Sequence, residues 1–207
     1  MKINFILILL FLINSQTYSQ SISRDLSISI SGGNFQVGHD YIKGIWTGVE
    51  IKKSLSKNKE HFLSKIKAGG EMYFENGADK ATVYNPTPSQ FMHDRYFHES
   101  NTALAGKLTY YPFRSFLSGL YFSAGPLIVY SIRTFENRAE LIQYGPETFI
   151  RMSEIHSDNE LLGGYRLTGG YTIYVTNNWF IGIRADIEQF HNRDLNSLLG
   201  LTVGFDM

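Results

Sequence analysis

Five of the six histidines in this chain fall in segments predicted to be outer loops, and each of the five has an acidic residue close to it in the sequence. Histidine and carboxylate side chains are the usual ligands of Zn²⁺ in a protein without cysteine, so histidines gathered at one rim of a fold would allow a composite metal site. The spacing His93-x4-His98 matches no strong zinc signature, however, and polar loops contain histidines by chance. We therefore expect neither a metal site nor any other cofactor. The pairs are His39 with Asp40, His93 with Asp94, His98 with Glu99, His156 with Asp158, and His191 with Asp194.

The segment FHNRDLNSLLGLTVGF, residues 190–205, offers a second candidate chemistry. It resembles the C-terminal end of lipid A deacylases, which are barrels with a histidine, a serine and a carboxylate at the membrane edge, and such a set suits ester hydrolysis. Arg193 stands where this resemblance places the nucleophilic serine, and Ser197 is a poor substitute by spacing. The chain also has no P-loop, dinucleotide fingerprint or nucleophile elbow. We therefore expect a non-enzymatic protein, with a lipid-modifying hydrolase as an alternative.

Apolar residues occupy every second position in two segments of the last third of the chain. Between Trp179 and Glu188 the odd positions are apolar, whereas the even positions include Arg184 and Asp186. The closing segment 199–206 repeats the alternation. Because successive side chains of a strand point to opposite faces, each segment has one apolar and one polar face. About 10 such residues are enough for a strand to cross a membrane as part of a β-barrel.

The same period of two marks about eight strands along the chain. The connections between them alternate between long ones, at Asn76–Asn101 and Thr134–Glu160, and short ones. Outer-membrane barrels have short periplasmic turns and longer outer loops. The sequence therefore predicts an all-β fold, a closed antiparallel transmembrane β-barrel of about eight strands. Pro126 falls within one of these strands, where it costs one ladder hydrogen bond and should cause a local irregularity. The expected strands are 25–35, 45–54, 63–75, 102–111, 119–133, 161–175, 179–188 and 199–206, and the short connections are 55–61, 112–118 and 176–178.

The polar faces of these strands carry both signs of charge in similar number. An eight-stranded barrel has an interior just wide enough for side chains to fill it, and an unpaired charge buried there costs several kcal/mol. Opposite charges on the inner face should therefore pair into a network that closes the lumen. A narrow small-solute channel is the alternative, although ion-selective channels usually carry one sign in excess. The predicted lumen charge network is Glu50, Lys67, Glu71, Lys107, Arg166, Arg184, Asp186 and Glu188, with Lys52 and Arg133 on the same face.

The N-terminus has the features of a secretory signal peptide. A basic start at Lys2 is followed by an apolar run, Ile3–Ile13, and by the fairly small residues of a cleavage site at Thr17–Ser19. Residues 1–19 are therefore predicted to be a signal peptide and residues 20–207 one barrel domain. The run of about 11 residues is too short for a membrane-spanning helix, which needs about 20. The absence of cysteine excludes disulfides, a thiol nucleophile and a cysteine-linked lipid, and the net charge of zero predicts no nucleic-acid partner.

Three stretches carry a resemblance to a known family: YYPFRSFLSGLYFSAG, YTIYVTNNWFIGIRADIE and LLGLTVGF. They are similar to small OmpA/OmpX-like outer-membrane barrels, in particular the outer membrane protein beta-barrel domain type that includes PorT-like proteins. The resemblance implies the outer membrane of a Gram-negative bacterium as the location. It also implies outer-membrane lipid, the insertion machinery and an extracellular or envelope protein as partners. These barrels often end on an aromatic residue, which the insertion machinery recognises. Here Phe205 is followed by Asp206 and Met207, so the aromatic residue lies two positions before the last one. A soluble lipocalin-like barrel is a further alternative in fold.

Overall fold

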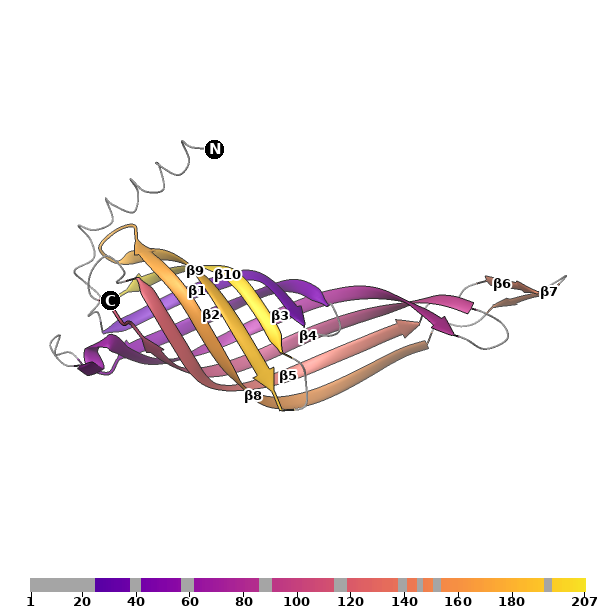
Figure 1. Cartoon of the computed structure of the whole chain (residues 1–207), viewed down its shortest axis with the longest axis horizontal. Coiled ribbons are helices and arrows are strands. Elements are labelled where there is room, and N and C mark those ends of the chain that lie inside the picture. Colours follow the sequence, from indigo (N-terminus) through magenta and orange to yellow (C-terminus); the bar gives the residue numbers. More distant parts are fainter. Residues whose placement is uncertain are drawn as a thin grey trace, which may run out of the picture.

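The computed structural model describes residues 25–37, 42–56, 62–85, 91–113, 119–137, 141–144, 147–150, 154–191 and 195–207. Within these residues, eight strands close into one antiparallel barrel in the order β1-β10-β9-β8-β5-β4-β3-β2 (Figure 1). The closed barrel that the alternation predicts is therefore the fold of this chain. The barrel strands are β1 (Leu26–Val37), β2 (Lys43–Ser54), β3 (Ile66–Asn85), β4 (Phe91–Tyr110), β5 (Leu120–Asn137), β8 (Glu154–Tyr174), β9 (Trp179–Phe190) and β10 (Asn196–Asp206).

The first and last barrel strands pair with each other and close the sheet. The β1–β10 ladder runs from the pair Ser27 and Asp206 to the pair Val37 and Asn196. The short connections β2–β3, β4–β5 and β8–β9 lie at the end of the barrel where β1 begins and β10 ends, which we call the terminal end. A single turn of 3-10 helix, Phe62–Lys65, precedes β3 there. The other end is the projecting end.

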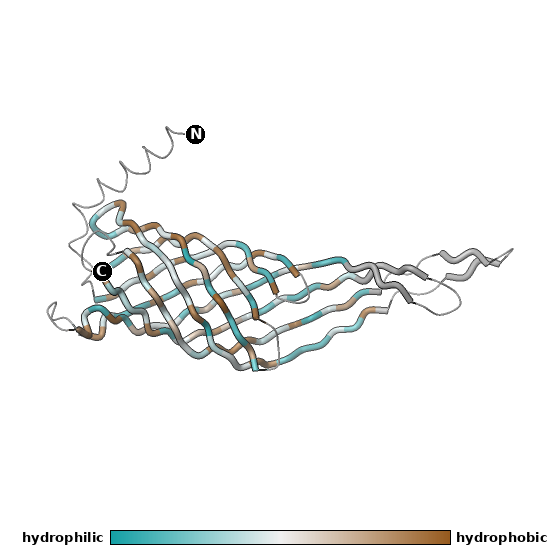
Figure 2. The backbone as a smooth tube through the Cα atoms, in the orientation of Figure 1, coloured by the Kyte–Doolittle hydropathy of each residue, from teal (hydrophilic) through white to brown (hydrophobic). Residues whose placement is uncertain are grey.

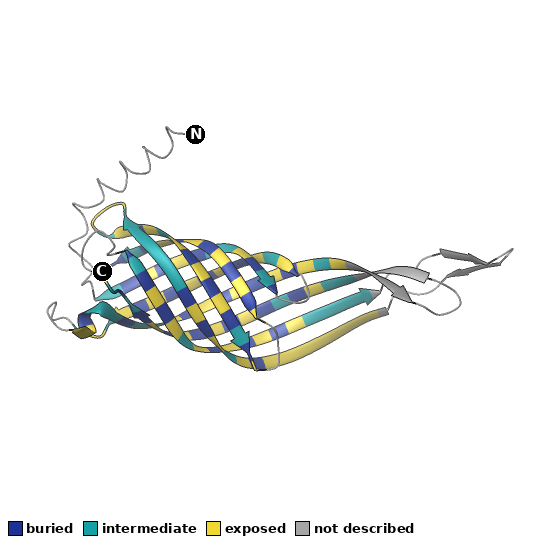
Figure 3. Ribbon diagram, viewed as in Figure 1, coloured by how far each residue is buried: buried dark blue, intermediate teal, exposed yellow. Residues whose placement is uncertain are grey.

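Burial alternates along the barrel strands as the sequence predicts (Figure 3). In β9 the side chains of Ile181, Ile183 and Ile187 are exposed, whereas Arg184 and Asp186 are buried. Hydropathy alternates along the same strands, so the outer surface is largely aliphatic and the inner one largely polar (Figure 2). The alternation follows from the strand backbone, which sends neighbouring side chains to opposite faces.

Four strands continue well beyond the barrel at the projecting end (Figure 1). The segment 76–101, expected to be a loop, is largely a β-hairpin, because β3 runs to Asn85 and β4 begins at Phe91. The segment 134–160 likewise contains the end of β5, the start of β8 and a separate hairpin of β6 (Leu141–Tyr144) and β7 (Glu147–Ile150). The expected loop boundaries are therefore wrong. The sequence of these extensions has no regular apolar alternation, so backbone pairing alone defines them as strands.

Pro126 lies at an interruption of the β4–β5 ladder. Pairing stops after Ala105 and Leu127 and resumes at Leu108 and Ala124 in the same register. The predicted irregularity is therefore a gap in the ladder without a shift of register, as expected for a residue that has no N–H group to donate.

The predicted signal peptide, residues 1–19, lies outside the described residues. Within the described ranges, no helix is long and apolar enough to cross a membrane.

Candidate functional site in the barrel lumen

All the residues of the predicted charge network are buried inside the barrel. Their alternate positions on β2, β3, β4, β8 and β9 turn them inward, and their exposed fractions do not exceed 4%. Buried charges are stable only when they are paired and hydrogen-bonded. The contacts between them therefore decide what the lumen can do.

Glu71 on β3 is the centre of this network. Arg184 donates two hydrogen bonds to its carboxylate, from Nη1 to Oε1 at 2.9 Å and from Nη2 to Oε2 at 3.0 Å. Arg166 lies 3.4 Å from Oε2, and Lys107 pairs with the same oxygen. One carboxylate is thus held by three cations that come from three other strands.

Asp186 and Glu188 on β9 extend the network toward the projecting end. Asp186 accepts a hydrogen bond from Arg184 at 2.8 Å and one from the Thr168 hydroxyl at 2.5 Å, and it lies 3.1 Å from Arg166. Glu188 lies 3.4 Å from Nε of Arg166 and accepts a hydrogen bond of 2.5 Å from the Tyr73 hydroxyl. Each arginine therefore joins at least two carboxylates.

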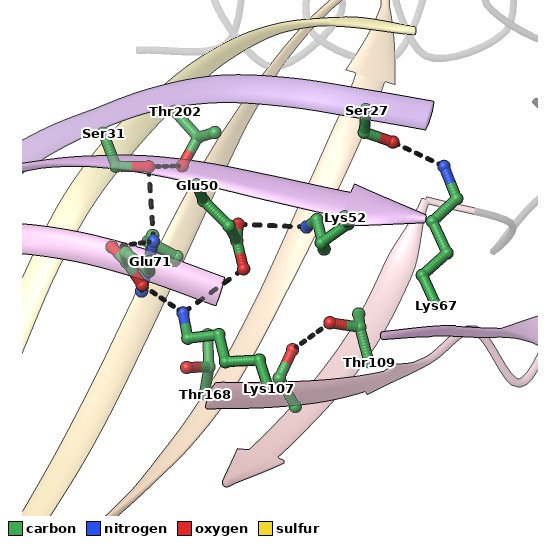
Figure 4. Close-up of polar contacts among 12 residues, drawn as sticks. Ser27, Ser31, Glu50, Lys52, Lys67, Glu71, Lys107, Thr109, Thr168 and Thr202 are labelled. Atoms are coloured by element: carbon green, nitrogen blue, oxygen red, sulfur yellow. Dashed lines mark hydrogen bonds and ion pairs between the residues drawn. The ribbon is translucent and has the colours of Figure 1, made fainter. Parts of the chain in front are cut away.

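Glu50 and Lys52 extend the network toward the terminal end. Lys52 lies 3.1 Å from Glu50, and Lys107 lies 3.4 Å from the other oxygen of the Glu50 carboxylate. Figure 4 shows Lys107 pointing between Glu50 and Glu71. We call the connected set the central network, and it has as many acidic as basic members. It consists of Glu50, Lys52, Glu71, Lys107, Arg166, Arg184, Asp186 and Glu188.

Lys67 is buried but belongs to a separate contact near the terminal end. Its ammonium donates a hydrogen bond to the Ser27 hydroxyl at 2.6 Å and lies 3.7 Å from Asp206. Asp206 also accepts a hydrogen bond from Tyr174. Asp206 was not among the predicted network residues, although its place on the polar face of the last strand indicates an inward carboxylate.

Two aromatic side chains pack on the arginines of the central network. The Arg166 guanidinium lies 4.2 Å from the ring centre of Tyr73, and that of Arg184 lies 5.0 Å from the ring centre of Trp46. Both aromatic residues are buried at inward positions. The rings attract the cations and occupy the space beside the ion pairs. Alternation alone turns these rings inward, but their contact with the arginines depends on strand register.

The lumen toward the projecting end contains two apolar clusters and a second group of acids, which the sequence analysis did not predict. Glu75 accepts a hydrogen bond from the Asn101 amide at 2.8 Å, and Glu99 pairs with the half-buried Arg133 at 2.9 Å. Glu75 follows Glu71 and Tyr73 at the same spacing of two residues, so the alternation would have predicted its inward position. The apolar clusters are Tyr73, Ala103, Ala105, Leu127, Val129, Leu162 and Phe190, and Phe35, Val37, Ile42, Trp46 and Leu198.

The described residues do not assemble the metal site or the hydrolase site that the sequence offers as alternatives. Among the described residues, no three His, Cys, Asp or Glu side chains form a group that could hold a metal ion. His156 pairs with Asp158 at 3.0 Å on an exposed strand, while His39, Asp40, Asp194 and the side chains of His93 and Asp94 lie outside the described part. His191 and Ser197 are both exposed, and in the described part of the chain no hydrogen bond joins their side chains. Arg193 lies outside the described residues.

No protein-family model and no curated protein sequence matches the chain. Among solved structures, the chain is similar to the attachment invasion locus protein Ail of Yersinia pestis, at 10% identity over 89% of this chain and 99% of that one, with a TM-score of 0.47. It is also similar to Neisserial surface protein A, at 9% identity over 88% and 97% of the two chains, with a TM-score of 0.44. A third is the N-terminal β-barrel domain of Pseudomonas aeruginosa OprF, at 15% identity over 87% and 97%, with a TM-score of 0.37.

Proposed function

We propose that this protein is an integral outer-membrane β-barrel without enzymatic activity, whose lumen is closed by its own side chains and whose projecting strands bind an envelope or extracellular partner. The observation that carries the proposal is the distribution of side chains. Large aliphatic residues are exposed on the outward faces of the strands, and paired charges are buried inside. In water such a surface would be a severe aggregation hazard. Facing hydrocarbon, it is the ordinary exterior of a transmembrane barrel.

Aromatic residues on the outer surface support a membrane location. At the terminal end, Trp179 packs against Phe205 with ring centres 5.2 Å apart, and Phe62 packs against Tyr110 at 5.8 Å. Girdles of aromatic residues flank the apolar band of outer-membrane barrels, where their rings sit at the level of the lipid headgroups. A soluble lipocalin-like barrel would instead need a polar exterior.

The central network supports a closed lumen. Glu71 on β3 and Arg184 on β9 belong to opposite sides of the barrel, because equal numbers of strands separate β3 from β9 in either direction. Their hydrogen bonds therefore span the lumen near the middle of the strands. The network is balanced in charge, whereas a selective pore usually presents one sign to the passing ion. These contacts favour a side-chain plug over a small-solute channel.

The projecting strands support a partner-binding role. The β2–β3 ladder ends at Ala78, and the β8–β9 ladder begins only at Gly164. Beyond these residues, β3-β4-β5-β8 is an open sheet, and its outer edges lack a partner strand among the described residues. A strand of another chain can add to such an edge through backbone hydrogen bonds. A hydrolase would need an accessible nucleophile in contact with a base. The hydroxyls of Ser27, beside Lys67, and of Thr168, beside Asp186, are instead buried in the lumen.

Conductance in a planar bilayer tests the closed lumen. The purified barrel should fold into phospholipid vesicles, shown by faster migration of the unheated sample in gel electrophoresis, and should then give no steady conductance of porin size. Large, stable, ion-selective currents from the folded wild-type protein would overturn the plug and support the channel. Failure of the protein to insert into vesicles at all would overturn the membrane location itself.

A further inference from the structure

Four polar side chains surround Ala78 on the outer surface of the barrel, at the level where β3 begins to project beyond β2. Lys43 of β2 and His98 of β4 pair with Ala78 from either side. Asn76 and Lys80 lie two residues before and after it on β3, so the alternation of the strand places them on the same face. All five residues are exposed. We call Lys43, Asn76, Lys80 and His98 the outer basic patch.

The side chains of the outer basic patch are close enough to hold one small ligand. Residues that face each other in neighbouring antiparallel strands have Cα atoms about 4.5–5.5 Å apart, and alternate residues of one strand are about 6.7 Å apart. Lys43 and His98 are therefore separated by two strand spacings, about 10 Å. The methyl group of Ala78 lies between them and leaves the space above it open.

The outer basic patch consists of groups that bind anions. Two of its side chains are lysines, and the amide of Asn76 and the imidazole of His98 can each donate a hydrogen bond. The Lys80 ammonium lies 5.4 Å from the ring centre of Tyr96, and this cation–π contact holds it over β3 and β4. Glu136 adds a carboxylate on the same row, but Tyr96 lies between it and Lys80 in the sheet. The patch therefore has a net positive charge.

The outer basic patch follows directly on the apolar belt of the barrel. Ile45, two residues after Lys43, is 68% exposed, and Phe74, four residues before Ala78, is 47% exposed. Four residues of a strand span about 13 Å, which the tilt of a barrel strand reduces to about 10 Å along the membrane normal. Exposed aromatic rings of such barrels lie at the membrane interface. Beyond Phe74, the patch is therefore at the level of the lipid headgroups.

We propose that the outer basic patch binds the unshielded phosphate of an anionic lipid headgroup. The proposal rests on the membrane location argued above, because only there does a lipid lie beside Ile45 and Phe74. The lysines attract the phosphate by charge, and Asn76 and His98 donate hydrogen bonds to its oxygens. The acyl chains of the same lipid lie against the apolar belt. A second copy of the barrel presents the same positive charge at this place, and a soluble anion gains nothing from the belt.

Native mass spectrometry of the folded protein tests the proposal, after release from micelles that contain equal amounts of phosphatidic acid and phosphatidylcholine. The two lipids carry the same acyl chains, but choline shields the phosphate of the second one. Wild-type protein should retain phosphatidic acid about tenfold more often, as expected for a few charge-assisted hydrogen bonds. Lys43→Glu and Ala78→Glu each place a carboxylate in the patch and should abolish this preference.

Lys53→Glu is the matched control for Lys43→Glu. Lys53 is also exposed on the outer face of β2, but it pairs with Ala68 at the terminal end of the barrel. Lys53→Glu should therefore keep the wild-type preference. Lys43→Arg should keep it as well, because a guanidinium binds phosphate through two hydrogen bonds. Faster migration of the unheated samples in gel electrophoresis shows that each variant is folded.

Inorganic phosphate, added in place of phosphatidic acid, should not be retained. Its retention at the same level would identify a site for soluble anions and overturn the lipid assignment. Equal retention of phosphatidic acid by the wild type and Ala78→Glu would also overturn the proposal, as would equal losses in Lys43→Glu and Lys53→Glu. If the wild type inserts into vesicles but prefers neither lipid, only this inference fails, whereas failure to insert defeats the proposed membrane location.

Discussion

Arg184 donates two hydrogen bonds to Glu71 across the lumen, at 2.9 Å and 3.0 Å, although 113 residues separate them in the chain. Neither residue is more than 3% exposed. The pair therefore connects two opposite walls of the barrel through its interior.

Removal of Arg184 should destabilise the barrel, and simultaneous removal of Glu71 should restore part of the loss. Arg184→Met leaves Glu71 and Asp186 each without one cation, and breaking a buried pair costs about 3–5 kcal/mol. The double variant with Glu71→Gln should recover part of this free energy of unfolding. Urea titration in phospholipid vesicles, followed by tryptophan fluorescence, measures all variants. Strictly additive losses would show that the two side chains are not coupled.

Two glutamates on the same strand should respond differently to the same substitution. Glu71 contacts Lys107, Arg166 and Arg184, so Glu71→Gln should lower the free energy of unfolding by about 3–5 kcal/mol. Glu75 accepts a hydrogen bond from Asn101, and no cation lies within ion-pair distance of it among the described residues. Glu75→Gln keeps that bond and should change stability by less than about 1 kcal/mol. Equal losses in urea titration would contradict the central role of Glu71.

An arginine on the outer surface should be costly only at the level of the membrane. Ile183 and Ile155 are both exposed, at 59% and 70%, but Ile183 lies in the barrel and Ile155 in the projecting part of β8. Ile183→Arg should destabilise the folded barrel by about 2–4 kcal/mol if it lies at the bilayer midplane. Ile155→Arg should leave stability unchanged. Urea titration in vesicles measures the free energy of unfolding of both variants. Similar losses at both positions would contradict the proposed position of the membrane around the barrel.

The two ends of the barrel should face different compartments. An epitope tag inserted between Asn85 and Phe91, in the β3–β4 connection, should be labelled by antibody on intact cells, because that hairpin projects from the barrel. A tag between Ser56 and Phe62, at the terminal end, should be labelled only after the outer membrane is opened. Labelling of the second tag on intact cells would reverse the orientation.

The faces of the strands were readable from the sequence. A strand alternates its side chains whatever lies beside it, so the spacing of Ile183 and Arg184 already assigns one to the outer surface and the other to the interior. The inward position of the predicted network residues followed from the same rule. Glu99 was not predicted as an inward residue. It lies in a stretch where polar residues occupy both faces, so alternation of hydropathy cannot assign its direction.

Tertiary structure decided everything that depends on which strands are neighbours and in what register. Alternation places Glu71 and Arg184 on an inner face, but only closure of β1 on β10 brings β3 and β9 to opposite sides of one narrow lumen. Strand pairing also decides that Lys67 lies apart from the central network and how far the projecting strands extend. The physical reason is that side-chain direction is a property of the local backbone, whereas a contact across a barrel depends on the alignment of all the strands between its partners.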